Sequence, residues 1–115
     1  MKKYTFITGD TIEMDGKVLT RIKRISDGAI GGYIESENNL SHEDDAWVSE
    51  NAQVYGDARV SGDAIVYGDA WVYGDARVYG NAQVYGDAQV YGDAQVSGNA
   101  RVYGGALVYG NARVS

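Results

Sequence analysis

The chain contains one histidine, His42, and histidine is the side chain most often used in general acid–base catalysis. A histidine could act as the general base of an acyl transfer. Zinc enzymes hold their metal with several nitrogen or sulfur ligands, whereas this sequence has one histidine and no cysteine. No serine stands at a convincing spacing from His42 for nucleophilic catalysis. We therefore predict no catalytic residue, no metal and no cofactor, and we expect His42 to be a solvent-exposed loop residue.

Acidic and amide residues recur along the chain at a regular interval. At an interval of 18 they form two columns, Asp57, Asp75, Asp93 and Asn51, Asp69, Asp87. Stacked carboxylates could bind calcium, but calcium-binding repeats of this general kind have a different period and paired glycines. We expect these side chains to hydrogen-bond local backbone and to pair with Arg59 and Arg77. A second possibility is that the regular array of negative charges mimics a phosphate backbone and acts as a decoy for a nucleic-acid-binding protein.

Aromatic residues follow the same interval. Tyrosines form one unbroken column, and the column beside it contains a tryptophan and a leucine. Tyrosines in register stabilise neighbouring strands by about 0.5–1 kcal/mol a pair, so a purely structural role could explain them. An exposed aromatic strip is also typical of a protein-binding surface. The residues that we predict to bind a partner are Tyr55, Trp71, Tyr73, Tyr91, Leu107 and Tyr109.

The element that must position these columns is a short repeat. From Asp45 to Gly110 the sequence divides into eleven units of the form [D/N]-A-x-V-[Y/S]-G, with few exceptions. In the unit DARVYG, Ala76 and Val78 are two residues apart, so on an extended segment they point to one side and their neighbours to the other. The glycine and the Asp or Asn after it tolerate the backbone of a sharp corner. Three such units can close a triangular coil whose successive turns stack parallel strands.

The repeat V-Y-G-[D/N]-A-x, over residues 45–115, resembles the hexapeptide repeat of left-handed parallel β-helices. The resemblance implies an all-β, left-handed parallel β-helix of about four triangular coils. The segment GGYIESENNLS, residues 31–41, resembles the start of short YdcK-like repeat proteins of bacteria and phages. That second resemblance implies a phage or prophage origin.

The first 44 residues lack the repeat and are expected to cover the first coil. Asp15-Gly16 is a strong hairpin signal, so we predict a β-hairpin cap over residues 1–27. Residues 28–44 are expected to form an irregular first coil with Ile30, Ile34 and Leu40 inward.

The other end of the repeats has no such cap. We expect an edge built from Val102, Val108 and Val114 to pair with a second copy in an end-to-end homodimer, although a truncation at Ser115 would explain the same edge.

The composition favours a binding protein. The formal net charge is −6, and both the first 44 residues and the repeats carry more acids than bases, which makes nucleic-acid binding unlikely. No apolar run is long enough for a membrane span or signal peptide, so we expect a cytoplasmic protein. We predict a non-enzymatic protein-binding module that inhibits a host protein, for example an immune effector. A hexapeptide acyltransferase and a structural assembly module remain alternatives.

Overall fold

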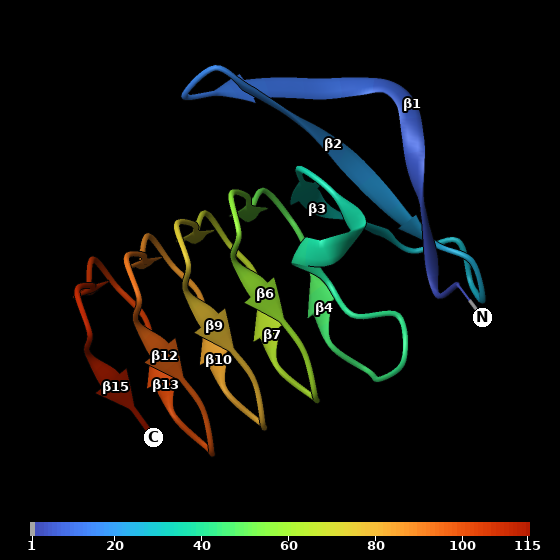
Figure 1. Ribbon diagram of the computed structural model, residues 1–115. Helices are drawn as coiled ribbons and strands as arrows, with labels where there is room; N and C mark the ends of the chain where they lie inside the picture. The colour runs from blue at the N-terminus through green and yellow to red at the C-terminus, as the bar shows by residue number, and fades with distance from the viewer. Residues whose placement is uncertain (1) are drawn as a thin grey trace.

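The computed structural model describes residues 2–115, and most of this range is a coil of very short β-strands (Figure 1). Met1, the first residue of the predicted cap, lies outside the described residues. The N-terminal elements are β1 (Tyr4–Met14), β2 (Lys17–Arg24), β3 (Ile30–Ile34) and the 3-10 helix η1 (Glu37–Asn39). The repeat strands are β4 (Trp47–Val48), β5 (Gln53–Val54), β6 (Arg59–Val60), β7 (Ile65–Val66), β8 (Trp71–Val72), β9 (Arg77–Val78), β10 (Gln83–Val84), β11 (Gln89–Val90), β12 (Gln95–Val96), β13 (Arg101–Val102), β14 (Leu107–Val108) and β15 (Arg113–Val114).

The repeat strands form the three faces of a parallel β-solenoid. The first face contains β4, β7, β10 and β13, the second contains β5, β8, β11 and β14, and the third contains β6, β9, β12 and β15. Each strand pairs with the strand three units later, as Gln89 does with Leu107, so the predicted interval of 18 residues is confirmed. Residues 28–44 add an irregular turn through β3, which pairs with β5, and Leu40, which pairs with Val60. The solenoid therefore has about five turns, the four predicted coils and this first one. Its left-handedness stays a prediction.

The interior is built from the two residues of each unit that the alternation places inward. The valines of the repeat strands from Val48 to Val96 are fully or almost fully buried, and so are the alanines of the same units. Burying one valine side chain stabilises the fold by about 1.5–3 kcal/mol relative to leaving it exposed. Because each inward residue lies above the equivalent residue of the previous coil, neighbouring coils stabilise each other.

The corners are tight turns with one residue in the left-handed region. At the corner after β5, Ala58 N donates to Tyr55 O over 3.4 Å, and Gly56 has a φ of +66°. Asp57 does not have a positive φ, so the turn is of type II′. Only the glycine of each glycine–Asp or glycine–Asn pair uses left-handed backbone. At one corner Glu50 occupies the glycine position, with a φ of +57°.

The predicted hairpin is present, and it extends the second face. β1 and β2 pair around Asp15 and Gly16, which both have positive φ, and β2 then pairs antiparallel with β3. The second face therefore continues into a seven-stranded sheet, β1-β2-β3-β5-β8-β11-β14. The pairing of β1 with β2 shifts between Phe6 and Thr11, where β1 bends sharply (Figure 1).

The first coil differs from the prediction at one inward position. Ile34 and Leu40 are fully buried as expected, but Ile30 is 52% exposed. Gly31 lies so close to the next coil that a Cβ there would meet Val48 O at 2.7 Å. Because the glycine backbone itself contacts the coil, the isoleucine before it turns outward.

Candidate functional site

The second face carries the predicted tyrosine column as a stack of parallel rings. Successive ring centroids are 5.1, 5.0 and 5.4 Å apart, and the planes are within 11° of parallel, along Tyr55, Tyr73, Tyr91 and Tyr109. Strands β5, β8, β11 and β14 place the four tyrosines in register, one residue after each strand. The ring spacing therefore follows directly from the spacing of the coils.

One of the six predicted partner-binding residues is covered. Tyr55 is 3% exposed, because the hairpin tip lies over it and its hydroxyl donates to Asp15 Oδ2 over 3.4 Å. Burial, with the nearby Asp15 carboxylate, raises the pKa of Tyr55 to about 12. The sequence carries no local signal for this contact, since Asp15 is 40 residues away.

The other five residues remain accessible to different degrees, and we call them the aromatic strip: Trp71, Tyr73, Tyr91, Leu107 and Tyr109. Leu107 and Tyr109 are more than half exposed, at 55% and 57%. The other three side chains are partly exposed. β8 and β11 bring Trp71 beside Gln89, and Tyr73 donates to Gln89 Oε1 over 3.3 Å. The structure thus brings the predicted residues, apart from Tyr55, onto one accessible surface.

A second tyrosine stack lies on the first face. Tyr67, Tyr85 and Tyr103 stack with centroid distances of 4.8 and 5.4 Å. Ring stacking is therefore a general result of the register and does not by itself mark a binding face. The second face differs in its neighbouring column, where Trp71 and Leu107 add apolar area.

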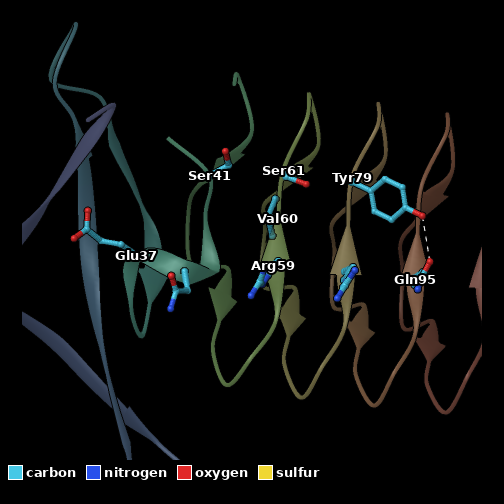
Figure 2. Close-up of a pocket in the computed structure, with 9 residues that line it drawn as sticks. Glu37, Ser41, Arg59, Val60, Ser61, Tyr79 and Gln95 are labelled. Atoms are coloured by element: carbon cyan, nitrogen blue, oxygen red, sulfur yellow. Dashed lines mark hydrogen bonds between the residues drawn. The ribbon is translucent and has the colours of Figure 1, made fainter. Parts of the chain in front are cut away.

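The third face has a hollow in place of a tyrosine stack (Figure 2). Serine occurs before the corner at Ser41 and Ser61, and the space left open is about 550 Å³. The hollow, which we call the arginine hollow, is lined by Glu37, Asn38, Ser41, Arg59, Val60, Ser61, Arg77, Tyr79 and Gln95. Figure 2 shows Tyr79 directed toward Gln95 at one end, and its hydroxyl donates to Gln95 Oε1 over 3.1 Å.

Arg59 and Arg77 differ from the prediction in their partners. Within residues 2–115, neither guanidinium of Arg59 and Arg77 has a carboxylate within 4.0 Å. The corner aspartates of the repeats also form no side-chain hydrogen bond to local backbone in this range. Both predicted contacts were wrong, because the corner is closed by backbone bonds such as Asp57 N to Gly74 O, 2.9 Å. The aspartate side chains are left to solvent.

The repeat identifies the kind of protein. Residues 52–68, 58–74, 70–86 and 94–109 match the YdcK beta solenoid repeat. These matches, together with the coils of the structure, fit a YdcK-like repeat β-helix protein. The matched segments contain strands of all three faces, including most of the aromatic strip and both arginines of the hollow. No curated protein matches the chain.

The single histidine of the chain is packed, and each of its ring nitrogens forms a hydrogen bond. The His42 ring stacks on Tyr4 at a centroid distance of 4.0 Å, and its side chain is 17% exposed. Its Nδ1 accepts the Lys3 backbone N–H at 3.0 Å, so Nε2 carries the proton and donates to Glu37 Oε1 at 2.7 Å. The expectation of a solvent-exposed loop residue was wrong, since β1 lies against this corner. Neither ring nitrogen has a free lone pair for proton abstraction.

The predicted dimer edge lies in the last described coil. Val102 and Val108 are buried against the preceding coil, and Val114 is half-buried. Alanines that are buried elsewhere are exposed here, at Ala106 and Ala112. Pairing of a second chain on this edge stays a prediction.

Two further site types have findings of their own. Residues 2–115 hold no group of three or more His, Cys, Asp or Glu side chains placed to bind a metal ion. In the same residues, no helix has the length and apolar character needed to cross a membrane.

Proposed function

We propose that this YdcK-like protein is a non-enzymatic binding module that docks on another protein through the aromatic strip. The observation that carries the proposal is the accessible, in-register row of Tyr73, Tyr91 and Tyr109 beside Trp71 and Leu107. Tyrosine and tryptophan are enriched at binding hot spots, and rigid aromatic side chains lose little entropy on binding. Hydrogen-bonded coils hold these rings at a constant spacing, so the surface is organised before a partner arrives.

The charges around the strip favour one kind of partner. Each strand of the second face from β5 to β11 begins after one acidic or amide corner and ends at an acidic one. The carboxylates of Asp69 and Asp75 at the two corners beside β8 have no ion-pair partner within residues 2–115. An aromatic centre between two acidic margins complements an apolar patch with basic residues at its rim.

The finer proposal concerns origin and role. Residues 31–41 resemble the start of YdcK-like proteins of bacteria and phages, and small size with strong acidity suits an inhibitor that occupies a basic surface of a host protein. An immune effector of the host is the target class that we propose. The occupied ring nitrogens of His42 support a binding role over acyl transfer, because that chemistry needs a free base.

A capture experiment with two matched variants tests this proposal. Trp71→Ala/Tyr73→Ala/Tyr91→Ala alters the aromatic strip, and Tyr67→Ala/Tyr85→Ala removes two stacked tyrosines of the first face. Both variants should keep the circular dichroism of the intact protein, since all five side chains point outward. We expect a host protein that is retained by the intact chain and by the first-face variant and lost by the strip variant.

Two results would contradict the proposal. Equal retention by both variants would show that the strip is structural and that the partner binds elsewhere. Turnover of acetyl-coenzyme A that disappears in His42→Ala would instead establish an acyltransferase. Light scattering at rising protein concentration separates the assembly alternative, which predicts fibres.

A further inference from the structure

The arginine hollow has the composition of an anion-binding site. It exists because Ser41 and Ser61 occupy the position before the corner at which Tyr79 stands one coil later. Ser41 and Ser61 lie in one column, since Ser41 N donates to the backbone oxygen of Val60, over 3.0 Å. Hydroxyl groups therefore line a space that two phenol rings would otherwise fill (Figure 2).

Two guanidinium groups from neighbouring strands border this space. β6 and β9 pair Arg59 directly with Arg77, so the two side chains leave neighbouring rungs that lie about 4.8 Å apart. Both are exposed, and neither forms an ion pair within residues 2–115. Like charges directly opposite on paired strands repel each other. An anion that bridges the two groups would remove this repulsion.

The carboxylate in the lining already has partners of its own. Glu37 Oε1 lies 2.7 Å from His42 Nε2 and 3.3 Å from Lys2 Nζ. The hydrogen bond from His42, followed by that from Lys2, holds the pKa of Glu37 below its ordinary value. Glu37 therefore stays ionised and interacts with His42 and Lys2, and it forms no ion pair with Arg59 or Arg77 within residues 2–115.

We propose that the arginine hollow binds a phosphate monoester, with its oxygens between Arg59 and Arg77 and with the hydroxyls of Ser41 and Ser61 as further donors. A phosphate monoester carries about −1.5 to −2 charges at neutral pH, which matches two guanidinium groups. Each guanidinium presents a planar fork of donors that fits phosphate oxygens. The bond from Tyr79 to Gln95 keeps that ring at the side of the space as a wall. This site is on a different face from the aromatic strip and does not depend on it.

Titration of the full chain by nuclear magnetic resonance tests the site. The probes are inorganic phosphate, O-phosphoserine and phenyl phosphate, added at constant ionic strength with chloride as the balancing anion. We expect saturable shifts of the Ser61 and Arg77 amides, and binding about ten-fold weaker in Arg59→Gln. Arg101→Gln is the matched control, because it removes the same charge from an exposed position on the first face. We expect it to bind as the intact chain does.

A second variant separates shape from charge. Ser61→Tyr keeps both arginines but fills the hollow with a ring that can stack on Tyr79, as the tyrosines do on the other faces. We expect it to fold and to lose binding. Both relative strengths of binding support recognition of the phosphate group: stronger binding of the two esters than of inorganic phosphate shows that the organic part also contributes, and equal binding shows that the phosphate group alone is bound.

Three results would overturn the proposal. They are the absence of saturable shifts with all three probes, equal weakening in Arg59→Gln and Arg101→Gln, and unchanged binding in Ser61→Tyr. A melting curve for each variant shows that the compared chains are folded.

Discussion

Replacement of one corner glycine by alanine measures how tightly the coils are stacked. Gly80 has a φ of +68°, and a Cβ placed on it would lie 2.9 Å from Gly98 N and 3.2 Å from Gly98 O in the next coil. These are backbone atoms that cannot rotate away. Gly98 is also held in place, since its carbonyl accepts Asn81 N–H at 2.7 Å. Gly80→Ala must therefore push two coils apart or distort the corner.

The neighbouring glycine of the same corner column is a matched control. Gly98 has a φ of +62°, but a Cβ on it would meet only Ser115, at 3.8 Å or more, which is ordinary contact. Left-handed backbone costs an alanine about 1–2 kcal/mol, and both variants share this cost and the gain from a less flexible unfolded chain. Overpacking adds about 1–3 kcal/mol, and it applies to Gly80→Ala alone. We expect Gly80→Ala to be less stable than Gly98→Ala by about 1–3 kcal/mol.

Urea unfolding followed by circular dichroism gives both values. Repeat proteins can unravel from one end, so the comparison requires the same dependence of free energy on urea concentration in both variants. Equal loss of stability in the two variants would refute the close contact between Gly80 and the backbone of Gly98. A larger loss in Gly98→Ala would also refute the inference that Gly80 is the more tightly packed of the two glycines.

Three further predictions concern the buried side chains of Asn39, Tyr55 and Gln53. Asn39 is fully buried; its Oδ1 accepts hydrogen bonds from two backbone N–H groups, and its Nδ2 donates to two backbone carbonyls. In Asn39→Asp a carboxylate oxygen would face both carbonyls, so we expect the variant to lose about 3 kcal/mol of stability, measured by urea unfolding. The pKa of Tyr55 is raised from 10.0 to about 12 in the folded state. Neutral Tyr55 therefore stabilises the folded state fully below pH 10.0, and this contribution is lost as the pH rises to about 12. In Tyr55→Phe the urea midpoint should decline less steeply over that pH range than in the intact protein. Within residues 2–115 the buried Gln53 Oε1 has no hydrogen-bond partner. Gln53→Met should therefore raise the melting temperature by an amount that corresponds to about 1 kcal/mol of added stability.

The coil could be predicted from sequence because one rule determines every unit. Alanine and valine alternate with outward residues, and the interval of 18 places like positions in columns. The stacking of Tyr73 on Tyr91 follows from these two facts. No contact outside neighbouring coils is needed for that part of the fold, so local pattern was sufficient.

The failures occur where residues distant in sequence meet. Tyr55 is covered by Asp15, and His42 is packed by Tyr4, both across long intervals that carry no periodic signal. The corner aspartates failed for another reason. The repeat suggested local side-chain bonds, but the type II′ turn closes through its own backbone and the inter-coil bonds.

The arginine hollow did have a signal in the sequence, which was the choice of serine in place of tyrosine before the corner. Each outward position that departs from the common pattern changes the surface without affecting the coil, because the inward alanine and valine are unchanged. Serine before two successive corners of one column removes two rings, and the arginines opposite each other on β6 and β9 supply charge to the space that results. Aromatic residues in unbroken columns instead produce flat strips. In a solenoid of this kind the choice of serine or tyrosine before each corner therefore decides whether a face is hollow or flat, and the residue between alanine and valine decides its charge.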